Sequence, residues 1–109
     1  MDDTTILKLY KGLAKKTTEN ALSWQRTADG NTYLLSLRES SVSVQFQKAS
    51  NGTSIYTLSV RNEKGEVVDS VRVGPGSPRF KMVAEIFDVA KRNALKTDET
   101  IANVLEQLR

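Results

Sequence analysis

The chain contains no cysteine and no histidine. Without cysteine it forms no disulfide, binds no metal through thiolates and offers no thiol nucleophile. Without histidine it lacks the side chain that most readily transfers protons near neutral pH and most often binds metals. The two absences exclude Ser-His-Asp and Cys-His catalytic groups and zinc held by His or Cys. Carboxylate, lysine or tyrosine chemistry remains open, and we expect no cofactor and no metal.

Long apolar runs and a strong charge of one sign are also missing. No stretch approaches the roughly 20 apolar residues of a membrane-spanning helix, and the opening Met1-Asp2-Asp3 is acidic where a secretory signal is basic. The net charge is only +3, from 16 basic and 13 acidic residues, with no block of like charge. A length of 109 residues is typical of one domain. We therefore expect a single cytoplasmic domain over residues 1–109.

Apolar residues recur at spacings of three and four in three segments, which predicts three amphipathic helices. The first covers residues 4–17 and follows acidic and hydroxyl residues that suit a helix start. The second begins at Ser77-Pro78, because serine is a favoured N-cap and proline a favoured first helical residue. The third begins at Thr97-Asp98, and its apolar stripe consists of Ile101, Val104, Leu105 and Leu108.

Between Leu22 and Val73 the apolar residues fall on every second position, as in half-buried strands. Five such stretches follow one another at intervals of about ten residues. Turn-forming sequences such as Asp29-Gly30-Asn31 and Ser50-Asn51-Gly52 separate them. Short strands joined by tight turns predict an antiparallel meander.

Together these elements predict an α+β fold. We expect a five-stranded antiparallel meander with one N-terminal and two C-terminal helices packed on one face, as a two-layer sandwich. The apolar side of the sheet and the stripes of all three helices would form the core. That core would contain Leu9, Leu13, Trp24, Leu35, Leu37, Val44, Phe46, Leu58, Val60, Val71, Phe80, Ile86, Phe87, Ile101 and Leu105.

The other face of the predicted sheet carries serine, threonine and glutamine, and its only charges are arginines. Arginine is enriched at protein interfaces, whereas lysine and glutamate are depleted there. A binding face is therefore one interpretation, and an ordinary solvated strand face without a partner is the other. The candidate partner-binding residues are Arg38, Ser43, Gln45, Ser59, Arg61 and Arg72.

The first predicted helix also carries a cluster of four lysines, Lys8, Lys11, Lys15 and Lys16. Lysines so arranged suit contacts with phosphates or with an acidic partner, although a solvated helix face has the same composition. The polar sheet face lacks the aromatic pair on which RNA-binding sheets stack bases. The cluster therefore marks a candidate nucleic-acid site on charge alone.

Two features bear on a catalytic or ligand-binding role. Asp69 interrupts Val67 and Val71 on the predicted core face, where a buried carboxylate needs a partner and shifts its pKa. A register shift that turns Asp69 outward is the alternative. The loop Gly74–Arg79 precedes a helix N-terminus, where backbone N–H groups can bind an anion. Its two prolines each lack an N–H donor, however, and an ordinary strand-to-helix connection is the alternative interpretation.

No pair of converging carboxylates and no nucleophile beside a base is recognisable, which argues against an enzyme. The leading hypothesis is a non-enzymatic protein-interaction module, such as an adaptor, chaperone-like or immunity-type protein, that binds another protein or a second copy of itself. The alternative is a nucleic-acid-binding domain that uses the arginines of the sheet and the four lysines. The layout resembles small bacterial domains without an assigned function, and this resemblance carries no motif and implies no activity.

Overall fold

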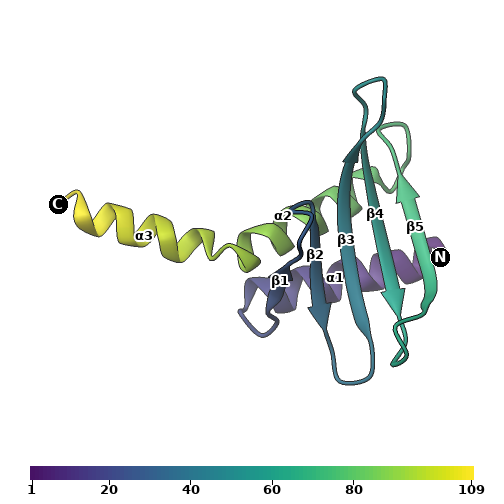
Figure 1. Ribbon diagram of the computed structural model, residues 1–109, viewed down its shortest axis with the longest axis horizontal. Helices are drawn as coiled ribbons and strands as arrows, with labels where there is room; N and C mark the ends of the chain where they lie inside the picture. Colours follow the sequence, from purple (N-terminus) through teal and green to yellow (C-terminus); the bar gives the residue numbers. More distant parts are fainter.

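The computed structural model describes residues 1–109 and shows a five-stranded sheet with three helices (Figure 1). All five strands belong to one open antiparallel sheet, which confirms the predicted α+β class. In chain order the elements are α1 (Asp3–Thr18), β1 (Trp24–Arg26), β2 (Thr32–Ser36), β3 (Ser41–Lys48), β4 (Ser54–Arg61), β5 (Val67–Val73), α2 (Phe80–Ala94) and α3 (Thr97–Gln107).

The sheet is a meander in which each strand pairs with the next one along the chain. Its register places Tyr33 opposite Val44, Val44 opposite Leu58, and Leu58 opposite Val71. One row of apolar side chains therefore crosses four strands on the same face. Because side chains alternate between the two faces of a strand, the serines and threonines between these residues point the other way.

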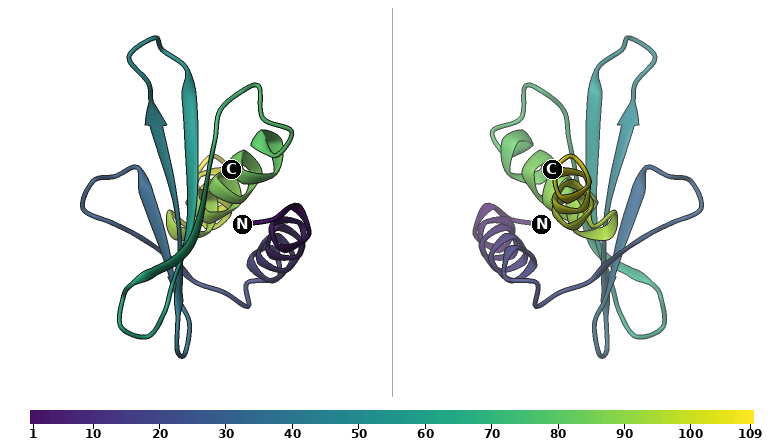
Figure 2. Two further views of the ribbon diagram at one scale, coloured as in Figure 1. Left: turned by 90° about the vertical axis from the view of Figure 1, so that its right-hand side faces the viewer. Right: turned by 90° about the vertical axis from the view of Figure 1, so that its left-hand side faces the viewer.

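Helices α1 and α2 lie on the apolar face, and the opposite face carries no helix (Figure 2). The two helices pack against each other, and α2 contacts β1, β2, β3 and β4. Of the predicted core residues, Leu9, Val60, Phe80 and Phe87 pack against the core partly buried. Phe46 is also partly buried, and its ring contacts those of Tyr56 and Phe87. The buried core consists of Ile6, Leu13, Trp24, Tyr33, Leu35, Val42, Val44, Leu58, Val71, Val73, Val83, Ile86 and Ala90.

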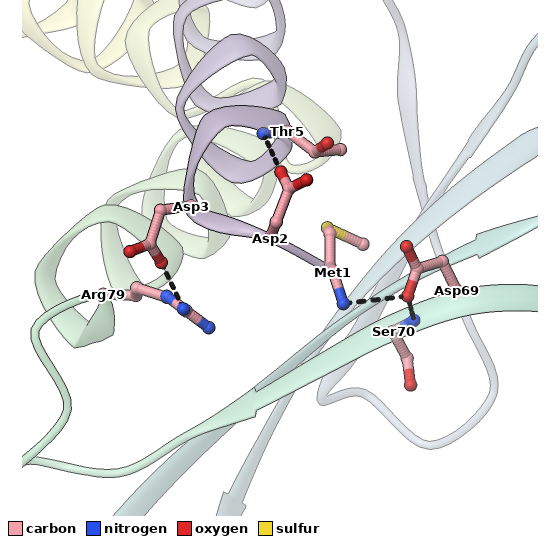
Figure 3. Close-up of polar contacts among 7 residues, drawn as sticks. All are labelled: Met1, Asp2, Asp3, Thr5, Asp69, Ser70 and Arg79. Carbon is pink, nitrogen blue, oxygen red and sulfur yellow. Dashed lines mark hydrogen bonds and ion pairs between the residues drawn. The ribbon is translucent and has the colours of Figure 1, made fainter.

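Two aspartates determine how α1 begins (Figure 3). Asp2 is the N-cap, and its Oδ1 accepts a hydrogen bond from the backbone N–H of Thr5 at 2.7 Å. This bond, made to the charged form, holds the pKa of Asp2 below its ordinary value. Asp3 forms an ion pair with Arg79, the residue just before α2. The pair links the N-terminal ends of the two helices that cover the sheet.

Two details of the predicted boundaries are wrong. Strand β2 ends at Ser36, so Leu37 lies in the following turn, 43% exposed, and not in the core. Helix α2 begins at Phe80 and not at Ser77. Ser77 instead accepts a hydrogen bond from the Arg79 N–H at 3.2 Å within the connecting turn.

Helix α3 forms where the sequence predicts it, but it does not enter the core. Ile101 and Leu105, both predicted to be core residues, are 49% and 62% exposed, and no residue of α3 is buried. Lys96 adopts a left-handed conformation (φ 52°) at the junction with α2, and α3 runs away from the sheet (Figure 1). The two-layer body consists of the sheet, α1 and α2, because these two helices already cover the apolar face.

Candidate binding surfaces

The outer face of the sheet, the face without a helix, holds five of the six candidate partner-binding residues. Ser43 lies directly opposite Ser59, and Gln45 lies opposite Thr57. Ser43 and Ser59 are only 7% and 9% exposed although no helix covers them. Their short side chains lie between longer ones, so the centre of this face is recessed.

Arg61 is the charged group that reaches over this recess. Its Nη1 donates a hydrogen bond to Ser43 Oγ at 2.7 Å. Arg61 as a residue is half-buried, and its guanidinium forms no ion pair with a carboxylate of the chain. Since a guanidinium has five N–H donors, the bond to Ser43 leaves donors for a ligand. A partly desolvated cation without a counter-ion favours an incoming anionic group.

A hollow of about 310 Å³ lies beside Arg61, and all eight residues that line it are polar. The hydroxyl groups of Ser43, Thr57 and Ser59 and the amide of Gln45 are among the lining groups. Hydroxyls and amides both donate and accept hydrogen bonds. Together with the guanidinium, they suit a carboxylate or phosphate oxygen that is bound next to other polar groups.

Asp29 lies at the edge of the hollow, in the turn between β1 and β2. Its Oδ1 accepts from the Asn31 N–H at 2.8 Å and from Thr27 Oγ1 at 3.1 Å, and its Oδ2 accepts from Thr32 Oγ1 at 2.8 Å. These bonds, the one from Asn31 above all, hold the pKa of Asp29 below its ordinary value. The carboxylate therefore organises the turn and does not neutralise Arg61.

The turn is recognisable in the sequence, but its spacing does not show that the Asp29 carboxylate borders the outer face. The signal that reveals the turn is the pattern Thr27-Ala28-Asp29-Gly30-Asn31-Thr32, in which threonines flank an aspartate at a hairpin turn. Gly30 supports the turn with a φ of 74°, a conformation that side chains disfavour.

The arginines predicted for this face differ in position. Arg72 lies opposite Thr57 on the outer face and is exposed. Arg38 does not lie on a strand, because β2 ends at Ser36 and Arg38 belongs to the exposed turn before β3. The prediction that Arg38 shares a sheet face with the other candidates is therefore wrong.

The lysine cluster lies on the other side of the molecule. Lys8, Lys11, Lys15 and Lys16 are all exposed on α1, and α1 packs on the apolar face of the sheet (Figure 2). The sheet thus separates these lysines from Arg61 and Arg72. The nucleic-acid hypothesis that uses the sheet arginines together with the four lysines requires one continuous positive surface. The two groups of positive charge do not form such a surface.

Asp69 lies on the core side of β5 but is not buried. It lies opposite Val60 in the regular β4–β5 register, just before the register shift between Val60 and Arg61, and its side chain is 47% exposed. Its Oδ1 lies 3.1 Å from the amino group of Met1 and accepts from the Ser70 N–H at 2.9 Å (Figure 3). Asp69 therefore has a cationic partner, and it does not line the polar hollow.

The loop Gly74–Arg79 offers no free cation either, because Arg79 is paired with Asp3. No group of three or more aspartates or glutamates is placed to hold a metal ion. No helix has the length and apolar character needed to cross a membrane.

The apolar stripe of α3 is the second uncovered surface. Its four residues, Ile101, Val104, Leu105 and Leu108, are between 49% and 76% exposed. A crevice of about 590 Å³ lies at the base of α3, beside the ends of α1 and α2. Asp98 and Glu99 line that crevice, but none of the four stripe residues does.

Comparisons of the chain with protein-family models, with curated proteins and with solved structures found no match. The geometry of these two surfaces is therefore the basis for a proposed function.

Proposed function

We propose that this chain is a non-enzymatic protein-interaction module that binds an acidic segment of another protein on the outer face of its sheet. The observation that supports the proposal is Arg61, which is half-buried, hydrogen-bonded to Ser43 and without a carboxylate partner in the chain. The kind of protein we have in mind is an adaptor, a chaperone-like or an immunity-type protein of the cytoplasm.

The chemistry of the outer face explains the choice of an acidic protein segment. A carboxylate can accept two parallel hydrogen bonds from a guanidinium, which fixes its orientation as well as its charge. The neighbouring Ser59 and Thr57 hydroxyls can bond to the backbone of the same segment. Neutral polar neighbours lose less on desolvation than charged ones. The face therefore combines a charged anchor, Arg61, with mainly neutral neighbours, while the carboxylate of Asp29 is held by the hydrogen bonds of its own turn.

The same groups give little support to catalysis. Ser43 Oγ accepts the bond from Arg61, and no base lies within hydrogen-bond reach to activate it. The one acidic group that lines the hollow, Asp29, has a lowered pKa, which makes it a weaker base. A binding role uses these residues as they are.

The test uses a direct probe and a matched control. A fluorescein-labelled peptide of alternating glutamate and valine is titrated into the protein, and its anisotropy is compared with that of a peptide in which glutamine replaces glutamate. Arg61→Gln removes the anchor, and Lys8→Gln removes one equal charge from α1 on the other side of the sheet. We expect Arg61→Gln to weaken binding of the acidic peptide by at least about tenfold and Lys8→Gln to leave it nearly unchanged.

A second arm uses cell lysate with quantitative mass spectrometry. Proteins that the wild type and Lys8→Gln recover should be lost with Arg61→Gln and with Ser59→Glu, after circular dichroism has shown that both variants are folded. Equal losses with Arg61→Gln and Lys8→Gln would show only a charge effect and would overturn the proposal. Preference for an oligonucleotide over the acidic peptide at low salt would favour the nucleic-acid alternative.

A further inference from the structure

The polar hollow on the outer face has a positive group, Arg61, on one side and a negative group, Asp29, on the other. We propose that it selects segments that carry an acidic and a basic residue two positions apart. In such a segment Arg61 binds the acid and Asp29 attracts the base. This inference rests on the proposed function, because it specifies which acidic segments the outer face prefers.

Hydrogen bonds to two hydroxyl groups show where the two charges lie. The guanidinium of Arg61 lies over Ser43, because its Nη1 donates to Ser43 Oγ at 2.7 Å. The carboxylate of Asp29 lies beside Thr32, whose Oγ1 donates to Asp29 Oδ2 at 2.8 Å. All four residues line the hollow. The positions of Ser43 and Thr32 therefore indicate how far apart the charges are.

The register of β2 and β3 gives that separation. Thr32 lies opposite Gln45, and Ser43 is two residues before Gln45 on the same strand. Thr32 and Ser43 are therefore diagonal neighbours on one face of an antiparallel pair, and such positions are about 7–8 Å apart. This is too far for an ion pair, and Arg61 and Asp29 form none. Each charge therefore remains available to a ligand.

Both charged groups also have bonding capacity left. The bond to Ser43 uses one of the five N–H donors of Arg61. Asp29 accepts three hydrogen bonds within its turn, and only the one from Thr32 is made to Oδ2. A carboxylate has about four acceptor sites, so Oδ2 can accept one more bond. The hollow can therefore bind a carboxylate on one side and a cationic N–H donor on the other.

An extended segment of a partner has the matching spacing. Alternate side chains of an extended chain point to the same side and are about 7 Å apart, at about 3.3 Å per residue. A segment that lies on the outer face can thus place an acid at Arg61 and a base at Asp29. A second acid in place of the base would lie beside the Asp29 carboxylate, and like charges repel. The hollow therefore favours a mixed acid–base pair over two acids.

The same separation distinguishes a peptide segment from a small zwitterion. In a free α-amino acid the ammonium and the carboxylate are attached to one carbon atom, so they are too close together to reach both Arg61 and Asp29. All eight lining residues are polar, so the hollow offers no apolar surface to a hydrophobic side chain. The occupant that fits is an extended peptide segment with charged side chains at alternate positions.

The first experiment compares three fluorescein-labelled peptides by anisotropy on the wild type. Their repeats are glutamate-valine-lysine-valine, glutamate-valine-glutamate-valine and glutamate-lysine-valine-valine. The first and third have the same composition, but only the first places glutamate and lysine on the same side of an extended chain. At low ionic strength, where charges at this distance are little screened, the first should bind at least about threefold more tightly than either of the others. General attraction to a chain of net charge +3 would favour the all-acidic peptide instead.

The second experiment removes the negative charge of the hollow. Asp29→Asn keeps the side-chain oxygen that accepts the backbone bond of the turn, and it should abolish the preference for the first peptide. Asp88→Asn is the matched control, because Asp88 is an exposed acid of α2, on the other side of the sheet (Figure 2). It should leave the preference unchanged, and circular dichroism checks that both variants are folded.

Two outcomes overturn the inference: equal binding of the two peptides of identical composition, or a preference that Asp29→Asn leaves intact. Arg61→Gln distinguishes this failure from failure of the proposed function. If Arg61→Gln weakens binding of the all-acidic peptide and the wild type shows no preference, only the selection for a base is wrong. If no peptide binds, or Arg61→Gln changes the binding of none, the proposed function fails together with the inference.

Discussion

Helices α2 and α3 follow each other along the chain, and both carry an apolar stripe, but only the stripe of α2 is buried. Helix α2 buries Val83, Ile86 and Ala90 against the sheet and α1. Helix α3 buries nothing and leaves its stripe exposed. The comparison shows that periodicity identifies the apolar side of a helix but does not say which surface covers it. Which surface covers a helix depends on how much of the apolar sheet face the other helices leave free.

Polar contacts reinforce the difference. The side chain of Asn93, near the end of α2, accepts a hydrogen bond from the Trp24 N–H of β1 at 2.8 Å. Glu85 of α2 accepts one from the Tyr10 hydroxyl of α1 at 2.8 Å. Helix α3 has the exposed pair Arg92–Asp98 at its start, and such pairs contribute little. Helix α2 is therefore fixed by packing and by polar contacts to two elements.

The largest effect should separate the two stripes directly. Ile86→Ala removes a side chain that is 1% exposed and should lower the free energy of unfolding by about 2–5 kcal/mol. Leu105→Ala, at 62% exposure, should change it by less than about 0.5 kcal/mol. Urea denaturation followed by circular dichroism measures both. A loss of more than about 2 kcal/mol for Leu105→Ala would show that α3 belongs to the core in solution.

A smaller effect should come from the tryptophan that fixes β1 beneath the helices. Trp24 Nε1 donates to Thr17 Oγ1 at 2.9 Å, and this pair is buried. Thr17→Val leaves the indole N–H without an acceptor and should cost about 1–3 kcal/mol. Thr18→Val is the matched control, because the Thr18 hydroxyl bonds only to the Ala14 carbonyl on the exposed side of α1. Unfolding monitored by tryptophan fluorescence compares them, and equal losses would contradict a specific role for the buried bond.

The smallest effect is a pH dependence of the contact between α1 and α2. The hydrogen bond to Glu85 is the main cause that raises the pKa of Tyr10 above its ordinary value of 10.0. The stabilisation is therefore fully present below the unfolded pKa of about 10 and is lost as the pH rises through the higher folded value. Tyr10→Phe removes this contribution. The difference in urea midpoint between wild type and Tyr10→Phe should shrink above pH 10, and a difference that is constant with pH would contradict the assignment.

The body of the fold was predictable because each strand repeats one signal. Val44 and Leu58 lie on alternate positions of their strands, and this two-residue period determines which face each side chain takes. Leu37 fits the same alternation but lies one residue past the end of β2. Hydrogen bonding of the backbone in the turn, and not hydrophobicity, decides where the strand ends. The alternation of apolar residues therefore predicted a second strand that is too long.

The candidate site was predictable in its composition but not in its geometry. The alternation placed Ser43, Ser59 and Arg61 on one face, as the structure shows. It did not show that Arg61 bends over Ser43, or that Asp29 satisfies its own turn instead of pairing with Arg61. The position of Arg61 over Ser43 depends on the register between β3 and β4, which no local spacing contains, whereas the bonds of Asp29 lie within its own turn.

The sequence by itself determined the elements and their two-sidedness: the five strands, the three helices and the polarity of each face follow from local spacing, because side-chain direction repeats with the backbone. Only the tertiary structure decided which apolar surfaces meet. The sheet has room for two helices, and α1 and α2 occupy it, so the stripe of α3 remains outside. Burial depends on the area that other elements leave free, and that is a property of the assembled molecule.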